Sequence, residues 1–305
     1  MNNFKDQNSN CDYLFIFCTY NRAKKTLKFL HSLIPQIEEL KLSHRICMLD
    51  DKSTDTTKYL IKQDFPQIEI IDGTGSLFWA GGMRTLYRLV SANILYKNLV
   101  VLNDDILLNK NSLRILLEEY MQLLVQYQEM CIYSASFLDT VTHKTSYSGF
   151  IRKPYHPLAF KKINSIGIPI EVDAINMNLV FIPKKVLMKC DFLSNYYQHS
   201  KADIDYSLRA KESGVRLYIS GNPAGYCCAN PTRKITDIIS EKKGIFLNFN
   251  NPKGISFLEI YYFYSRNGKN GWQLLLILVY AKYILIFIVA KFLKLIKKIF
   301  KNEYK

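Results

Sequence analysis

The first third of the chain alternates short apolar runs with stretches of helical periodicity, and no other feature constrains the fold as strongly. The apolar runs that we expect to be strands are 12–19, 45–50, 67–72 and 98–103. Between the first two runs, leucine and isoleucine recur at helical spacing, at Leu27, Leu30, Leu33 and Ile37. Strands that alternate with helices predict an α/β fold with a doubly wound, mostly parallel, Rossmann-like sheet. The run 98–103 is apolar throughout, which is typical of a strand buried on both faces.

Local signals set the expected limits of the helices. Pro35 is expected to end or kink the first helix. Ser53 is placed to cap the second helix, which should stop before Pro66. A glycine-rich loop is expected over 73–82, before a helix that runs to about Leu95.

The alternation of strand-like and helix-like segments becomes irregular after residue 130. Short strand candidates surround one clear helix that ends near Gly214, and these candidates are 131–135, 171–182 and 215–220. The chain contains no internal repeat and no low-complexity linker. We therefore expect one globular domain over 11–265 and a separate C-terminal segment over 271–305.

Paired carboxylates close two of the expected strands. Asp50 and Asp51 follow one strand, and Asp104 and Asp105 follow another. Ligands of such sheets bind beyond the carboxyl ends of the strands. Adjacent acids repel each other unless a cation offsets them, and Mg²⁺ or Mn²⁺ favours a few carboxylate oxygens together with phosphate oxygens. The alternative is that each pair caps a helix or lies on a solvated turn.

A third acidic cluster opens the clear helix of the irregular half. Asp203 and Asp205 are two residues apart, so they cannot share one helix face. One of them should face a ligand while the other caps the helix or pairs with a cation. The alternative is a helix N-terminus stabilised by acids against its dipole.

Five segments, in this order and spacing, resemble the motifs of family 2 glycosyltransferases over roughly 12–220. They are CTYNR (18–22), DDKSTD (50–55, with Lys52 where the family has Gly), FWAGGMR (78–84), LNDD (102–105) and DIDYSLR (203–209). LNDD resembles the LNND form that is common among rhamnosyltransferase-like members. The resemblance implies the GT-A fold and an inverting, metal-dependent transfer of a sugar from a nucleotide-sugar donor to a glycan acceptor.

The resemblance also implies roles for individual side chains. Asp105, helped by Asp104, would bind the divalent cation, Mg²⁺ or Mn²⁺, and Asp203 would be the general base that deprotonates the acceptor hydroxyl. Arg84 and Arg209 could bind phosphate, or they could be structural pairing partners. The residues that would contact the donor are Thr19, Asn21, Arg22, Asp50, Asp51, Trp79, Gly82, Arg84 and Asp104.

The chain departs from the family pattern in two places. The Glu that usually precedes the base is Ala202, and a His often found after the next strand is absent from the stretch 224–230. If that His completes a metal shell elsewhere in the family, Asn230 or water must replace it. His199 lies near the acidic helix and could meet the acceptor or serve only at the surface.

Cysteine usage and the N-terminus bear on the compartment. Seven cysteines show neither CxxC pairing nor metal-finger spacing, which argues for a reducing cytosol. The first ten residues contain no apolar core, so no secretory signal is expected. We expect the catalytic part to lie in the cytoplasm.

The C-terminal segment is apolar and basic. Residues 272–290 are mostly apolar, with Lys282 as the one charged residue, so their length permits a membrane span, but the central lysine is costly in hydrocarbon. Beyond them, lysines are expected on one side of a helix, at Lys291, Lys294, Lys297, Lys298 and Lys301. This pattern favours a peripheral or shallowly inserted helix at the cytoplasmic face of the plasma membrane. A true span, or a helix packed on its own domain, are the alternatives.

The net charge of +15 and the many aromatic residues also suggest a nucleic-acid-binding protein. The acids at the strand ends would repel a phosphate backbone, and no helix-turn-helix or RNP pattern occurs, so we expect no nucleic-acid partner. A nucleotidyltransferase would carry a glycine-rich phosphate loop in place of TYNR. A lipid-linked glycan as acceptor fits the C-terminal segment, and the resemblance points to bacterial surface polysaccharide synthesis. The sugar, the linkage and the oligomeric state stay open.

Overall fold

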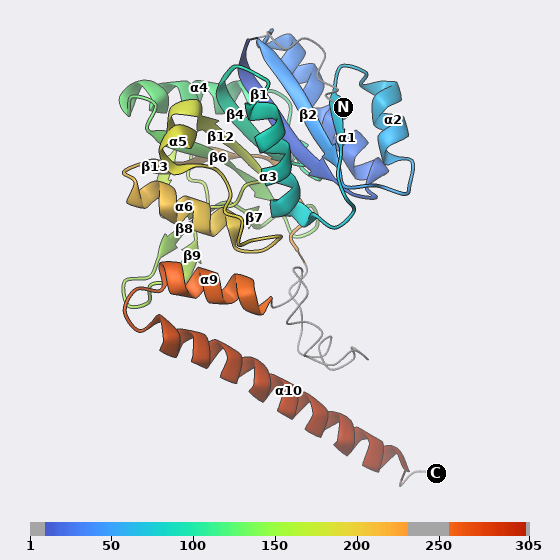
Figure 1. Cartoon of the computed structure of the whole chain (residues 1–305), viewed down its shortest axis with the longest axis vertical. Helices are drawn as coiled ribbons and strands as arrows, with labels where there is room; N and C mark the ends of the chain where they lie inside the picture. The colour runs from blue at the N-terminus through green and yellow to red at the C-terminus, as the bar shows by residue number, and fades with distance from the viewer. Residues whose placement is uncertain (1–9, 231–255, 303–305) are drawn as a thin grey trace. The chain divides into compact units, whose positions relative to one another are not determined.

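The computed structural model describes residues 10–230 and 256–302, and the chain divides into two compact units, Met1–Ala229 and Asn230–Lys305. The first unit holds an α/β sheet, and the described part of the second is helical (Figure 1). The predicted domain limits, 11–265 and 271–305, stay a prediction. The division into two compact units reflects contacts in the folded chain and does not show which segment folds independently. Residues 1–9, on which the expected absence of a secretory signal rests, lie outside the described residues.

One mixed sheet forms the centre of the first unit, with the order β10-β13-β6-β12-β4-β1-β2-β3. Its strands are β1 (Cys11–Thr19), β2 (His44–Asp50), β3 (Glu69–Asp72), β4 (Tyr96–Asn103), β6 (Cys131–Leu138), β10 (Ile170–Val172), β12 (Leu179–Pro183) and β13 (Arg216–Tyr226). The four N-terminal strands are mutually parallel, and β13 is parallel to β6. Strand β12 runs antiparallel between β4 and β6, and β10 is antiparallel to β13. The predicted α/β class with a mostly parallel sheet is confirmed.

Three short strands complete a second sheet, and two more join the first. The second sheet has the order β11-β8-β9, and it contains β8 (Gly149–Arg152), β9 (Phe160–Lys162) and β11 (Ala174–Ile175). In the first sheet, β5 (Leu107–Leu108) pairs with β13 and β7 (Thr145–Tyr147) pairs with β6.

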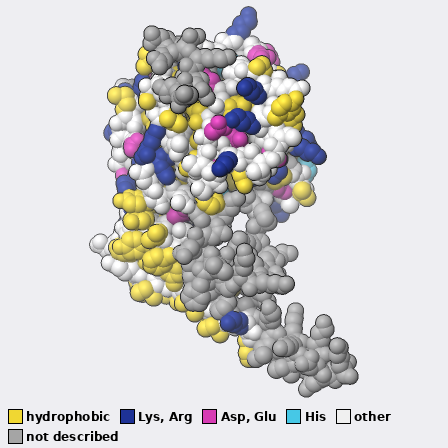
Figure 2. Space-filling model, turned by 45° about the vertical axis from the view of Figure 1, so that its right-hand side comes forward, with side chains coloured by type: hydrophobic (Ala, Val, Ile, Leu, Met, Phe, Trp, Pro, Cys, Tyr) yellow, Lys and Arg dark blue, Asp and Glu magenta, His cyan; other side chains and the backbone are white. Residues whose placement is uncertain are grey.

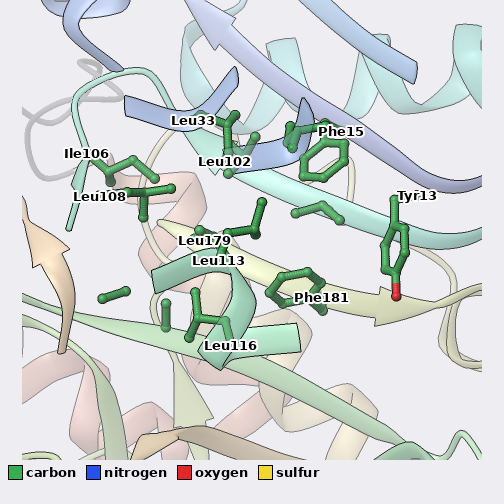
Figure 3. Close-up of a cluster of buried hydrophobic side chains, with 14 of the residues drawn as sticks. Tyr13, Phe15, Leu33, Leu102, Ile106, Leu108, Leu113, Leu116, Leu179 and Phe181 are labelled. Atoms are coloured by element: carbon green, nitrogen blue, oxygen red, sulfur yellow. The ribbon is translucent and has the colours of Figure 1, made fainter. Parts of the chain in front are cut away.

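Helices cover both faces of the central sheet (Figure 1). They are α1 (Ala23–Glu39), α2 (Thr57–Asp64), α3 (Phe78–Ser91), α4 (Ser112–Gln126), α5 (Lys184–Cys190) and α6 (Ala202–Glu212). Helices α1 and α4 share a hydrophobic core with the sheet, in which Phe15, Leu33 and Leu116 lie together (Figure 3). Strands β1 and β4 are buried on both faces, since Leu14 and Phe15 are both inaccessible, as are Leu99 to Leu102. The prediction for 98–103 is therefore confirmed.

Several predicted limits are wrong. Pro35 does not end α1, which continues to Glu39 because Leu33, Ile34 and Ile37 bury its face against the sheet, whereas the kink at Pro35 stays a prediction. Ser53 does not cap α2, which begins at Thr57; its hydroxyl bonds Asp50 instead.

The glycine-rich loop and the long strand candidate also differ from their predictions. Helix α3 begins at Phe78 and ends at Ser91, so Gly81 and Gly82 are helical rather than part of a loop. The candidate 171–182 is split into pieces of two sheets, since β10 and β12 belong to the first sheet and β11 to the second. Contacts between segments that are distant in sequence decided each of these limits. The local residue types alone do not predict such contacts.

The second unit contains α9 (Phe257–Asn267) and α10 (Trp272–Asn302). Ser256 caps α9 by accepting a hydrogen bond from the Glu259 N–H. Aromatic rings join the two helices, with Tyr261 5.5 Å from Trp272 and Phe257 5.3 Å from Tyr280 between centroids. Hydrophobic side chains are exposed on these helices, in the lower part of Figure 2.

By length and composition, Trp272–Leu293 is apolar enough to cross a membrane, and none of its described side chains is buried. The side chains from Lys294 to Phe300 lie outside the described residues. The lysine face predicted for this part of α10 therefore stays a prediction.

Candidate active site

The carboxyl ends of four parallel strands bring the predicted donor residues to one edge of the sheet. In the strand register Thr19 lies beside Asp50, and Cys18 lies beside Asn103. Thr19 and Asp50 are both buried, at 3% and 2% exposure. This edge is where open α/β sheets bind their ligands.

The first two motifs are tied to each other by hydrogen bonds. The Asn21 side-chain carbonyl accepts from the Thr54 N–H at 2.7 Å, and the Asn21 N–H donates to the Ser53 hydroxyl at 2.9 Å. The Ser53 hydroxyl in turn donates to Asp50. Lys52 stands where the family has Gly and adopts a left-handed φ of 62°, a conformation that glycine takes at lower cost.

Asp51 organises the segment before α3. Its carboxylate is buried and accepts from the N–H groups of Gly75 at 2.7 Å and Leu77 at 2.9 Å. A Cβ atom on Gly73 would lie 2.6 Å from Asp51 Oδ1, so the backbone approaches this carboxylate as closely as a glycine allows. Asp51 is thus engaged with the protein backbone.

Arg22 joins the two acids at the end of β4. Its guanidinium donates to Asp104 at 2.7 Å and to Asp105 at 3.0 Å. Burial raises the pKa of the Asp104 carboxyl, and the charge of Arg22 opposes that rise. Burial works to lower the pKa of Arg22, but the charges of Asp104 and Asp105 outweigh it, so the pKa of Arg22 is raised. Asp105 keeps 24% side-chain exposure against 5% for Asp104, so Asp105 is the better placed of the two to meet a ligand.

Cys227 contacts Asp105 from the end of β13. Its thiol donates to Asp105 Oδ1 at 3.7 Å and accepts from the Asn178 amide at 3.5 Å. Burial, reinforced by the charge of Asp105, raises the pKa of this thiol, which keeps it protonated. Cys227 lies in the stretch where the family often has His. This position was the one feature of the sequence that pointed to Cys227 as a site residue, and nothing in the sequence pointed to Asn178. Asn230, the suggested substitute, makes no hydrogen bond that would tie it to Asp105 among the described contacts.

The carboxylates suit a divalent cation only in part. Within residues 10–230 and 256–302, no group of three or more His, Cys, Asp or Glu side chains is arranged to hold a metal. Mg²⁺ and similar hard ions are commonly held by one or two carboxylates, with substrate phosphates and water as the other ligands. In that mode Asp104 and Asp105 would supply the carboxylate oxygens.

Asp203 stands in the first turn of α6 with one donor on each carboxylate oxygen. The Asn176 amide donates to Oδ2 at 3.2 Å, and the Ile204 N–H donates to Oδ1 at 2.9 Å. Burial raises the pKa of Asp203, while these two hydrogen bonds oppose the rise. A carboxylate with a raised pKa is a stronger base than an ordinary Asp. Asn176 was not predicted as a site residue, since nothing in the local sequence distinguishes it from other polar residues.

Asp205 has a structural partner instead, as the two-residue spacing predicts. Its inaccessible carboxylate accepts from Arg209 Nε at 3.0 Å and from the Tyr197 hydroxyl at 3.1 Å. Arg209 also donates to the carbonyls of Cys190 and Phe192. Of the two possibilities for Arg209, the geometry therefore favours the structural pairing partner.

Side chains of helix α3 connect the carboxyl ends of the parallel strands to the loop before α6. Trp79 donates from its indole to Asn103 at 2.8 Å, and Arg84 donates to the carbonyls of Ser194 at 2.8 Å and Tyr197 at 2.9 Å. Arg84 is thus bound to backbone carbonyls, which favours its structural alternative. A Cβ on Gly82 would lie 3.0 Å from the Cys18 sulfur, so this glycine allows α3 to pack closely on β1. His199 lies in the loop before α6, and its ring is 6.3 Å from the Phe78 ring.

One continuous path of contacts joins Asp105 to Asp203. It runs from Asp105 through Cys227 to Asn178. Two residues earlier, in the link between β11 and β12, Asn176 bonds Asp203. The segment 176–178 therefore contacts Asp203 directly and reaches Asp105 through Cys227.

The sequence profile of glycosyl transferase family 2 matches residues 14–171, which is more than half of the chain. The chain belongs to this family. The matched range contains the first four motifs, whereas the Asp203 segment lies beyond it.

The fold of this family 2 glycosyltransferase is similar to that of 274 chains in solved structures. One is the crystal structure of GalNAc-T7 with UDP, GalNAc and Mn²⁺, with a TM-score of 0.56 and 11% sequence identity. The match covers 84% of the family 2 glycosyltransferase but only 51% of the GalNAc-T7 chain, so our chain spans about half of that length. At this identity the likeness shows the fold alone, which is the predicted GT-A fold. A search of curated proteins finds no match.

Proposed function

We propose that this protein transfers a sugar, with inversion, from a nucleotide-diphosphate donor to a hydroxyl group of a lipid-linked glycan. The observation that carries the proposal is the contact path that joins the acids at the end of β4 to Asp203 on α6. A glycosyl transfer needs one charged group at the leaving diphosphate and one base at the acceptor. The path links a candidate for each, Asp105 after β4 and Asp203 on α6, through the short stretch between β11 and β12.

The donor end would use Asp104 and Asp105, with a divalent cation between them and the diphosphate. Such a cation neutralises the negative charge that gathers on the leaving nucleotide. The presence of UDP and Mn²⁺ in the GalNAc-T7 structure supports this choice of ligand and metal. Thr19, Asn21 and Asp50 line the same sheet edge and would hold the nucleoside.

The acceptor end would use Asp203 as the general base. The bond between the anomeric carbon and the phosphate oxygen breaks, the acceptor oxygen forms a new bond to that carbon, and its proton passes to Asp203. The two donors on Asp203 leave lone pairs free for that proton. One base without a protein nucleophile gives a single displacement, and hence inversion at the anomeric carbon.

The C-terminal unit supports a setting at the membrane. The exposed apolar stretch Trp272–Leu293 would attach the enzyme to the cytoplasmic face of a bilayer, where a lipid-linked acceptor is presented. The LNDD motif favours the rhamnosyltransferase-like branch of the family, and bacterial surface polysaccharide synthesis is the process that this combination fits. The acids at the strand ends argue against nucleic-acid binding, in spite of the net charge of +15.

The test is a panel of nucleotide sugars added to the full-length protein with Mn²⁺, with Mg²⁺ or with a chelator. A donor at a hundred times its Kd should stabilise the fold by about 2.7 kcal/mol. That corresponds to a rise of about 5–10 °C in Tm, and it should vanish with the chelator. The anomeric configuration of the product, read by NMR, tests inversion. Metal-independent stabilisation, or a product that retains the donor configuration, would contradict the proposal.

A further inference from the structure

The hairpin of β8 and β9 is a basic element that the proposed active site does not use. It carries Arg152, Lys153, Lys161 and Lys162, and no Asp or Glu occurs between Gly149 and Ile170. The hairpin lies in the small second sheet, where β9 is an edge strand. Its charge is therefore not neutralised by acids of its own segment.

Apolar and aromatic side chains are exposed on the same hairpin. Tyr155, in the turn, is 79% exposed, and Ile151 is 41% exposed. Ile151 lies opposite Lys161 in the strand register, so the two side chains share one face of the hairpin. The Lys153 ammonium lies 5.9 Å from the centroid of the Tyr155 ring, which places a charge beside the exposed aromatic.

The base of the hairpin is firmly attached to the α/β unit. Lys162 donates to the carbonyls of Thr145 at 2.6 Å and Ser146 at 3.1 Å. The Arg152 N–H donates to Asp173 at 2.7 Å, and the Lys153 N–H donates to the Ala159 carbonyl at 2.8 Å across the turn. The backbone of the exposed tip is thus held in place. Binding a partner therefore does not have to offset the loss of conformational entropy that ordering this turn would cost.

We propose that this tip is a second membrane contact, which binds anionic lipid headgroups independently of α10. Lys153 and Lys161 would meet the phosphates, while Tyr155 and Ile151 enter the interfacial layer. Lysines beside exposed apolar side chains fit such a surface, since anionic lipid attracts the cations and the interface accepts the apolar groups and the amphipathic tyrosine ring. A nucleic-acid backbone would complement the positive charge but would provide no apolar environment for the exposed Ile151 side chain. The proposal depends on the membrane setting proposed above, but it concerns a different element.

The test uses the full-length protein with a polarity-sensitive fluorophore on a cysteine at the tip. Tyr155→Cys is made in a Cys228→Ser background, because Cys228 is the exposed cysteine of the described residues. The matched control is Tyr59→Cys on α2, which is 69% exposed and lies outside the hairpin. Both labelled proteins are bound to phosphatidylcholine vesicles with and without phosphatidylglycerol, and quenching by aqueous iodide is measured.

With phosphatidylglycerol, we expect severalfold protection from iodide at position 155 and none at position 59. Replacing both Lys153 and Lys161 by Gln should weaken the contact of the tip roughly tenfold at low salt and remove most of the protection. Equal quenching at the two positions, or equal protection on neutral vesicles, would overturn the proposal. Transfer activity is measured on the same samples, so a protein that is protected at 155 but transfers no sugar would refute the proposed function alone.

Discussion

The guanidinium of Arg22 donates to the carboxylate of Asp104 over 2.7 Å, and it reaches Asp105 as well. One positive charge thus faces two negative charges at the end of β4. A divalent cation bound by the same carboxylates would compete with Arg22 for them. In the donor-free protein, Arg22 therefore supplies the charge that keeps the acid pair together.

Replacing Arg22 by Gln should raise the affinity of the donor-free protein for Mn²⁺ by about tenfold. The reason is that two adjacent carboxylates without a counter-charge attract a cation more strongly. Calorimetric titration of Mn²⁺ into the protein without nucleotide measures this change. The same variant should bind the nucleotide sugar more weakly, if Arg22 contacts the diphosphate when Mn²⁺ takes its place.

Arg114→Gln is the matched control for Arg22→Gln. Arg114 pairs with Glu39 at 3.0 Å on the surface, away from the β4 acids, so its removal should leave Mn²⁺ binding unchanged. Wild-type protein that binds Mn²⁺ as tightly as Arg22→Gln would show that the guanidinium does not compete.

Asp203→Asn should abolish transfer, leave donor binding intact and raise the free energy of unfolding at pH 7. Burial raises the folded-state pKa of Asp203 above its ordinary value. The protonated form is therefore stabilising at low pH, and this contribution is lost as pH rises through the raised pKa. At pH 7 the ionised carboxylate is a cost, which a neutral amide removes. Thermal unfolding, at about 2–4 °C per kcal/mol, measures the gain.

Asp205→Asn, two residues along the same helix, should change stability in the opposite direction. Its carboxylate is inaccessible and pairs with Arg209, which would be left buried without its counter-charge. Breaking a buried pair in this way costs about 3 kcal/mol or more. If both variants shift the Tm in the same direction, the division of roles between the two acids is wrong.

Asn176→Ala should move the acid limb of the kcat/KM profile to higher pH. The Asn176 amide donates to Asp203 and so opposes the rise in its pKa, and Lys201 opposes it as well. Without the amide the pKa of Asp203 rises further. Because the base works only when deprotonated, the acid-side loss of activity should then begin at a higher pH than in the wild-type enzyme.

Asn178→Ala controls for general damage to the segment between β11 and β12. Asn178 bonds Cys227 and has no hydrogen bond to Asp203 among the described contacts. Its replacement should leave the acid limb in place even if kcat falls. An equal shift in both variants would mean that Asn176 has no specific role.

Gly73→Ala should lower donor affinity and destabilise the fold by about 1–3 kcal/mol. The added methyl carbon would lie 2.6 Å from Asp51 Oδ1 and 2.8 Å from Asp51 Cα, so Asp51 and the loop that it holds must shift. Gly81→Ala on α3 is the control, since its nearest neighbours would be 3.8 Å away. That change should stabilise the helix by about 0.5–1 kcal/mol. Thermal unfolding and nucleotide-sugar titration of both variants distinguish the two effects.

The sequence by itself determined the α/β class, the mostly parallel sheet and the edge at which the acids gather. These features follow from short-range patterns, because apolar runs define strands and polar residues mark where each strand ends. The carboxylates Asp50, Asp104 and Asp105 could therefore be singled out without coordinates. The two-residue spacing of Asp203 and Asp205 likewise required different partners for them.

Only the tertiary structure decided which partners these side chains have. Cys227 meets Asp105 across 122 residues, and Arg84 meets Tyr197 across 113, so no local pattern reports either contact. Pro35 is carried inside α1 because the buried face of that helix outweighs one lost hydrogen bond. Hydrogen bonds and charges act over a few ångströms in space, whatever the distance along the chain, so only the folded backbone determines where they form.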